Sequence, residues 1–155
     1  MTINELPACV GGLEPSRGQV HAGRIMFSYL EWGESGAPLL LLHGITSSAR
    51  GWWRVAPELV ALGYHVYALD MPGHGQSQLV DAHRIDQIAS RIGDVLDALQ
   101  LAKPVVIGHS WGGAVALELA ASIAVARVAL VDPLLALSSE RGALRLPAYL
   151  VNADV

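Results

Sequence analysis

The pentapeptide Gly108–Gly112 (GHSWG) is the segment best suited to covalent chemistry, because it places one serine at the centre of a glycine-flanked turn. It follows the apolar run Pro104–Ile107 and precedes Gly113–Leu119, so the pattern predicts a strand, a sharp turn and a helix. The glycines permit a strained turn that exposes the hydroxyl, and the N-terminus of the helix favours developing negative charge. We therefore expect Ser110 to be a nucleophile; the alternative is a glycine-rich turn with an idle serine.

A nucleophilic serine needs a general base, and this sequence offers no histidine after His109. His109 itself is the neighbour of Ser110 and should point away from it. His43 and His74 fall in loops at strand ends, where we expect them to brace the loops by hydrogen bonding. The remaining histidines, all before the serine, are His21, His65 and His83.

The acid that would orient such a base has one candidate, Asp132, which follows Ser110 and stands at the end of a predicted strand. Asp132 precedes Pro133, and this pair is also an ordinary strand-ending turn. Both readings stay open. We expect Asp70, at the end of another strand, to cap the turn that follows it.

Alternating strands and helices must position these residues, and the chain predicts an α/β fold: a mostly parallel sheet of about six strands with helices on both faces. The strands are predicted from apolar runs at 39–42, 64–69, 104–107 and 126–131, and from an edge hairpin of 19–21 with 24–30. A short helix is predicted over 56–62. An apolar stripe at helical spacing predicts a longer one over 85–99.

The strand ends carry three short motifs, HG at 43–44, DMPGHGQS at 70–77 and GHSWGG at 108–113. In this order they resemble the α/β-hydrolase family, and its serine-nucleophile members in particular, from about Gln19 to Asp132. The resemblance implies an oxyanion hole made by the backbone N–H groups of Ile45 and Trp111. Family members that open epoxides or remove halogens have aspartate where this chain has Ser110, so the resemblance implies an acyl-enzyme.

The resemblance covers the N-terminal half of the family's fold, and the C-terminal strands that carry the common acid position and the histidine have no counterpart here. We expect an irregular leader at 1–17, the hydrolase core at 18–133, and at 134–155 the start of a lid or cap or a truncated connection. The base, and with it the acid if Asp132 does not serve, would then come from sequence beyond Val155. The chain alone would be inactive, whether it is truncated, processed or naturally short.

The expected function is hydrolysis of a carboxylic ester or related acyl substrate. Lactone, thioester and carbon–carbon bond hydrolysis stay open, and the loop after Leu42 lacks the HGGPG form of proline iminopeptidase relatives. Thr46, Trp52 and Trp53 could line the substrate pocket, although tryptophans at such positions more often belong to the core. The alternative is a non-catalytic fragment or pseudoenzyme that binds a small ligand or a partner chain. A second chain, or a second copy, could then pair with the edge strand 126–131.

Composition limits the remaining possibilities. The chain is 52% hydrophobic and 15% charged, as expected of a globular α/β protein. Its net charge is −4 without a Lys/Arg cluster, which argues against nucleic-acid or anionic-membrane partners. The single cysteine, Cys9, excludes an intrachain disulfide and fits a cytoplasmic location, and no run is long enough to span a membrane. Neither metal-ligand spacing nor a nucleotide loop is present, so no cofactor is expected.

Overall fold

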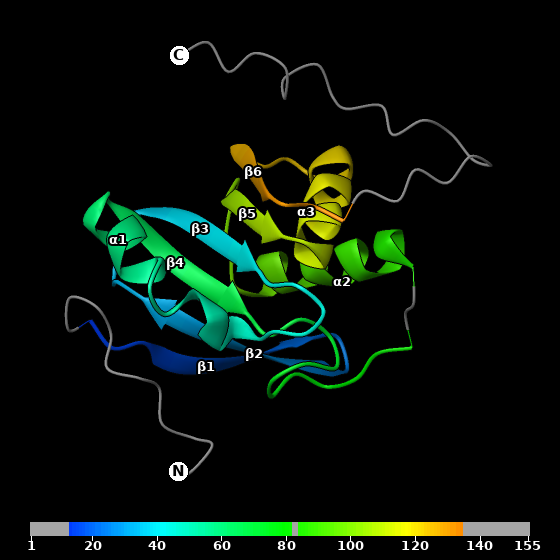
Figure 1. The fold of residues 1–155 in the computed structure, drawn as a ribbon. Coiled ribbons are helices and arrows are strands. Elements are labelled where there is room, and N and C mark those ends of the chain that lie inside the picture. Colours follow the sequence, from blue (N-terminus) through cyan, green and yellow to red (C-terminus); the bar gives the residue numbers. More distant parts are fainter. Residues whose placement is uncertain (1–12, 82–83, 135–155) are drawn as a thin grey trace.

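Six strands form one sheet in the order β1-β2-β4-β3-β5-β6 (Figure 1). The structure, a computed structural model, describes residues 13–81 and 84–134. The strands are β1 (Ser16–Ala22), β2 (Ile25–Trp32), β3 (Ala37–Leu42), β4 (Tyr64–Leu69), β5 (Val105–His109) and β6 (Arg127–Val131). β1, β2 and β4 pair antiparallel, while β4, β3, β5 and β6 are parallel. The predicted α/β class and mostly parallel sheet are confirmed.

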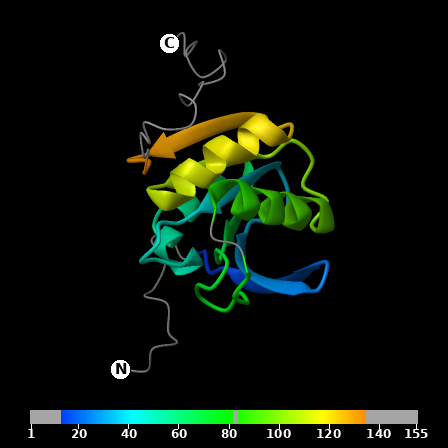
Figure 2. The same ribbon diagram turned by 90° about the vertical axis from the view of Figure 1, so that its right-hand side faces the viewer.

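In the described ranges, three α-helices and one 3₁₀ helix, η1, connect the strands. They are η1 (Ala49–Trp52), α1 (Ala56–Ala61), α2 (Ile85–Ala98) and α3 (Trp111–Ser122). Figure 1 shows α1 on one side of the sheet, and Figure 2 shows α2 and α3 together on the other. No described helix has the length and apolar character that crossing a membrane requires.

The sheet separates two apolar cores because successive side chains of a strand point to opposite faces. In β3, Leu39 and Leu41 join the cluster beneath η1 and α1, whereas Leu40 and Leu42 join the larger cluster beneath α2 and α3. All four are fully buried, as predicted for a parallel strand covered on both faces. The predicted helical stripe is also confirmed, since the buried face of α2 includes Ile88, Ile92 and Val95.

Asp70, at the carboxyl end of β4, fastens three separate segments to the sheet. Its side chain is almost fully buried, and its Oδ1 accepts a hydrogen bond of 2.8 Å from the N–H of Ala49 in η1. Its Oδ2 accepts from the N–H of Gln76 at 3.1 Å and lies 3.4 Å from a guanidinium nitrogen of Arg17 in β1. A buried carboxylate is tolerated only with such partners. The predicted capping role of Asp70 is confirmed.

The first strand starts earlier than predicted. β1 begins at Ser16, and the ladder pairs Ser16 with Glu31 and Arg17 with Leu30. The core therefore includes two residues that we expected in the leader ending at 17, because β2 is long enough to pair with them. Residues 1–12 of that leader, and 135–155 of the expected lid or connection, lie outside the described residues.

β6 stands at the end of the strand order, as predicted for an edge. Within the described part of the chain it pairs with β5 alone. Val128 and Leu130 pack against the core beneath α3, while Ala129 and Val131 are exposed, Val131 by 48%. An apolar parallel edge of this kind can pair with another strand.

From this edge we predict that the 155-residue chain self-associates at micromolar concentration, and that Val131→Lys reduces the association by placing a charge beside the open ladder. Sedimentation velocity measures both. Leu62→Lys is the control, because Leu62 is 74% exposed but lies after α1, away from the edge. A monodisperse 16.4 kDa monomer of the unmodified chain would contradict the prediction.

Candidate active site

Ser110 joins β5 to α3 in a backbone conformation that non-glycine residues rarely adopt, with φ 52° and ψ −116°. Such a residue costs on the order of 1–3 kcal/mol and persists only where its surroundings enforce it. At Gly108 a Cβ atom would lie 2.6 Å from the carbonyl carbon of Gly112 and 2.7 Å from the Cα of Gly113. The strand and the helix therefore cross too closely for any side chain at this position, which confirms the predicted sharp turn.

The first turn of α3 also packs directly on the end of β3. A Cβ atom at Gly112 would lie 2.6 Å from the carbonyl oxygen of His43 and closer still to that of Leu42. This contact brings the loop after β3 alongside the serine. Consistently, a Cβ at Gly44 would lie 3.2 Å from the Cβ of Ser110.

The end of β6 holds the backbone of Ser110. The N–H of Ser110 donates to the carbonyl of Val131 at 3.0 Å, and the carbonyl of Ser110 accepts from the N–H of Leu134 at 2.9 Å. That carbonyl also accepts from the N–H of Gly113 at 3.0 Å. Sequence reasoning missed these contacts, because only the sheet order places β6 beside β5.

The two backbone groups predicted to form the oxyanion hole are free of protein acceptors. Over residues 13–81 and 84–134, neither the N–H of Ile45 nor that of Trp111 donates a hydrogen bond. Ile45 is 60% exposed and Trp111 is the first residue of α3, so its N–H has no acceptor within the helix. Within the described ranges both groups are therefore able to donate to a bound anion, and the oxyanion hole stays a prediction.

His43 braces the loop that carries Ile45, as predicted. Its Nε2 accepts a hydrogen bond of 2.9 Å from the N–H of Met71, so its proton is on Nδ1, which donates to the carbonyl of Gly44 at 2.7 Å. Burial is the largest influence on His43 and lowers its pKa, which favours this neutral form. Because the carbonyl of Gly44 and the N–H of Ile45 belong to one planar peptide, His43 fixes the direction of that N–H.

No described histidine acts on the hydroxyl of Ser110, which has no hydrogen-bond partner among the described residues. His65 instead contacts Glu31 at 2.7 Å and the Tyr67 hydroxyl at 3.3 Å. The exposed His109 has its Nδ1 over Gly44. His83 lies outside the described residues. A general base is therefore not found in the described structure.

Asp132 follows β6 directly. It stands between Val131 and Leu134, whose backbone groups form hydrogen bonds with the backbone of Ser110. Its φ is 43°, and its side chain is exposed. It makes no hydrogen bond or ion pair with the described residues. The conformation fits a turn residue, and the catalytic role stays a prediction.

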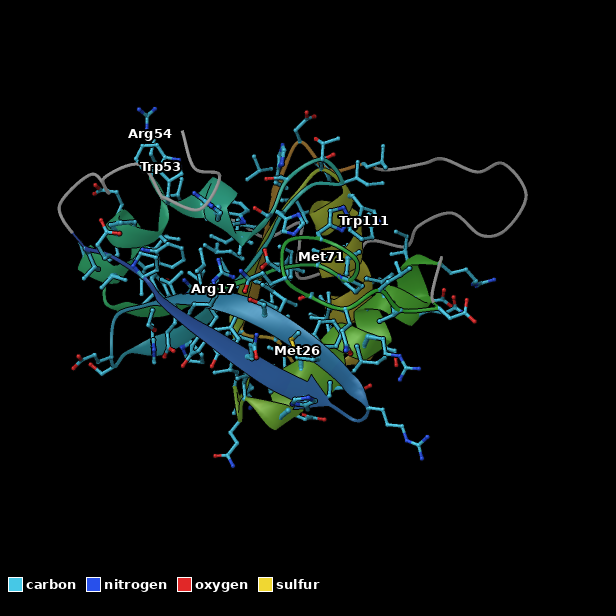
Figure 3. All side chains as sticks on the ribbon, turned by 90° about the horizontal axis from the view of Figure 1, so that it is seen from below. Arg17, Met26, Trp53, Arg54, Met71 and Trp111 are labelled. Atoms are coloured by element: carbon cyan, nitrogen blue, oxygen red, sulfur yellow. The ribbon has the colours of Figure 1, made fainter. Side chains whose placement is uncertain are left out.

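The three residues predicted to line the pocket, Thr46, Trp52 and Trp53, lie in three different environments. Trp52 packs against the apolar cluster beneath α1, with its indole N–H buried and unpaired among the described residues. Trp53 lies under the guanidinium of Arg54, 4.8 Å from the ring centroid, well apart from Trp111 (Figure 3). The two tryptophans therefore diverge at the end of η1, and the pocket assignment of both stays a prediction. Thr46 lies exposed beside Ile45.

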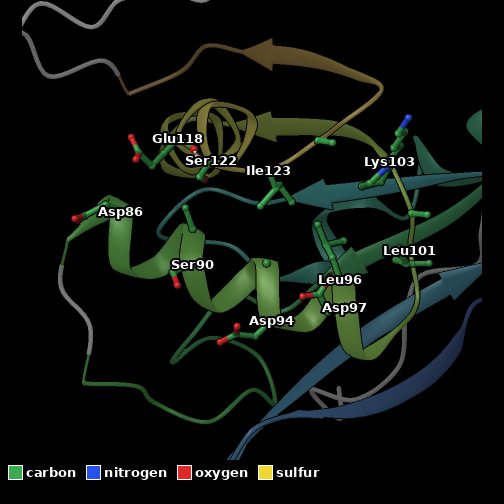
Figure 4. Close-up of a pocket in the computed structure, with 15 residues that line it drawn as sticks. Asp86, Ser90, Asp94, Leu96, Asp97, Leu101, Lys103, Glu118, Ser122 and Ile123 are labelled. Carbon is green, nitrogen blue, oxygen red and sulfur yellow. Dashed lines mark hydrogen bonds between the residues drawn. The ribbon is translucent and has the colours of Figure 1, made fainter.

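A cavity of about 610 Å³ lies elsewhere, between α2 and α3 (Figure 4). Its lining includes none of the predicted site residues. It includes four carboxylates, which belong to Asp86, Asp94, Asp97 and Glu118. Asp86 and Asp94 pair with Arg84 and Arg91. Among the described residues no cluster of histidine, cysteine or carboxylate side chains could hold a metal ion.

Comparison with known proteins agrees with this arrangement. A family model described as alpha/beta hydrolase fold matches residues 37–150. The chain is 36% identical over 119 residues to mouse epoxide hydrolase 4, covering 71% of this chain and 32% of that protein. It is 38% identical over 126 residues to lipase LipV of Mycobacterium tuberculosis, covering 79% and 48%.

A solved structure shares the fold at similar identity. Epoxide hydrolase A from Mycobacterium thermoresistibile superimposes with a TM-score of 0.69 at 33% identity, covering 75% of this chain and 38% of that one. The chain thus spans between about a third and a half of the length of these relatives.

The packing of Gly112 on β3 gives a prediction for stability. Gly112→Ala should lower the free energy of unfolding by about 2–4 kcal/mol, because its methyl group would overlap backbone atoms that cannot move independently. Gly93→Ala is the matched control: nothing lies within 4 Å of a Cβ at this position in α2, so alanine should stabilise the helix. The expected gain is about 0.5–1 kcal/mol. Urea unfolding measures both, and an unchanged midpoint for Gly112→Ala would contradict the packing.

Proposed function

Because this chain belongs to the α/β-hydrolase family, we propose that it is a serine hydrolase that cleaves a carboxylic ester or related acyl substrate through an acyl-enzyme on Ser110. One observation carries the proposal. Ser110 is held in a strained conformation at the N-terminus of α3, and the backbone N–H groups of Ile45 and Trp111 have no acceptor among the described residues. Strain of this kind at a reactive side chain supports a functional role.

The first chemical step would be attack by the Ser110 oxygen on the substrate carbonyl carbon. The serine proton passes to a general base, and the carbonyl oxygen becomes an oxyanion that accepts hydrogen bonds from Ile45 and Trp111. The positive end of α3 adds to this stabilisation. The tetrahedral intermediate then expels the alcohol, which takes the proton from the base and leaves an ester on Ser110.

Water would complete the cycle by attacking this ester. The base removes a proton from water, the second tetrahedral intermediate uses the same two N–H groups, and the carboxylic acid leaves as Ser110 recovers its proton. We assign the base to the part of the relatives' length that this chain does not span. The acid is either there or at Asp132.

Serine also favours acyl substrates over epoxides. Attack by an aspartate on an epoxide gives an ester that water can hydrolyse, whereas attack by serine would give an ether that water does not cleave under mild conditions. Ser110 therefore argues that this chain differs in chemistry from its relatives named epoxide hydrolases. The relative named a lipase fits the proposed substrate class.

Ser110→Ala should lower kcat/KM for p-nitrophenyl butyrate in the full-length protein by about 10⁴-fold or more, because it removes the nucleophile. The unfolding midpoint should not fall. Ser90→Ala, an exposed serine of α2, is the control and should leave turnover unchanged. Substantial turnover by Ser110→Ala would disprove the acyl-enzyme.

The oxyanion hole is tested by the contrast between two changes at one residue. Ile45→Ala keeps the N–H and should change kcat by less than about threefold, whereas Ile45→Pro removes the donor and should lower kcat by about 10²–10³. Urea unfolding checks that the proline variant is folded. In a crystal structure with a phosphonate on Ser110, a phosphonyl oxygen outside hydrogen-bond range of both N–H groups would exclude this assignment.

A further inference from the structure

His74 lies between the two segments that carry the proposed oxyanion donors. Its Nε2 is 2.6 Å from the carbonyl oxygen of Ile45, and its ring centroid is 5.5 Å from that of Trp111, at an interplanar angle of 38°. Its Nδ1 is 2.9 Å from the carbonyl oxygen of Pro72. The proposed chemistry gives this side chain no role.

The contact with Ile45 acts on the backbone next to the donor. His43 holds the peptide that contains the N–H of Ile45, and His74 holds the next peptide through its carbonyl. With both planes fixed, the dihedral angles of Ile45 have little freedom, so its N–H keeps one direction. The side chain of Ile45 is 60% exposed, so its own packing contributes little to holding the loop.

The direction of the hydrogen bond at Ile45 follows from its acceptor. A carbonyl oxygen only accepts, so the Nε2 of His74 carries the proton of this 2.6 Å contact. The ring also lies against the Trp111 indole of α3 and against His43, whose ring centroid is 5.2 Å away.

We propose that His74 is a positioning residue for the oxyanion hole: its Nε2–H donates to the carbonyl of Ile45, its ring packs on Trp111, and it thereby holds the N–H of Ile45 toward the site of Ser110. This inference rests on the proposed function, but its structural part can be measured without any reaction.

The reaction test uses a p-nitrophenyl phosphonate, which attaches to an activated serine and releases p-nitrophenol. In the full-length protein, His74→Phe keeps a ring beside Trp111 and removes both ring nitrogens. We expect it to lower the maximal rate constant of phosphonylation about tenfold, less than the loss of a donor itself, with little change in the concentration for half-maximal rate. His74→Gln retains one donor and should recover part of the rate. His21→Phe and His21→Gln, at an exposed position of β1, should react like the unmodified protein.

An NMR measurement separates this inference from the proposed function. The amide signal of Ile45 should shift in His74→Phe and stay in place in His21→Phe, whether or not Ser110 reacts. If the unmodified protein does not react with the phosphonate while the signal shifts, the proposed function fails and the positioning contact stands. If the unmodified protein reacts and His74→Phe reacts equally fast, or if the Ile45 signal does not move, the inference is overturned.

Discussion

The arrangement of the site depends on the close crossing of β5, α3 and β3 at Ser110. Neither Gly108 nor Gly112 has room for a Cβ, because backbone atoms of α3 and of the β3 end occupy that space. Close contact fixes the first turn of α3 against the sheet, which sets the strained conformation of Ser110 and the direction of the free N–H of Trp111. The same contact places the loop after β3 beside the serine. Protein interiors deform little, so a local crossing can hold a strained residue.

Polar groups at the carboxyl edge of the sheet keep the surrounding loops in place. The carboxylate of Asp70 holds η1 and the turn at Gln76, and the two nitrogens of His43 join the loop after β3 to the backbone at Met71. Buried polar atoms are costly unless paired, so each of these contacts specifies one loop conformation. This explains why His43 and His74 are not free to act as bases, because their ring nitrogens already have backbone partners.

The local sequence determined much of the fold and the strained turn at Ser110. β4 has the predicted bounds 64–69, and α2 begins at the predicted Ile85, because apolar periodicity reports which face of an element is buried. The glycines around Ser110 predicted its turn, since only their missing side chains permit it. Asp70 was predicted as a cap from its place at a strand end. These features depend on residues close together in sequence.

Only the tertiary structure decided which distant segments meet. The sheet order places Val131 and Leu134 on the backbone of Ser110, although more than 20 residues separate them from it in sequence. The contact of His74 with Ile45 joins residues 29 positions apart, and no local sequence pattern predicted it. Trp52 and Trp53 resemble pocket residues in sequence, yet η1 directs one into the core and the other to Arg54. Side-chain direction in a short turn is set by what it packs against, which a single sequence does not contain.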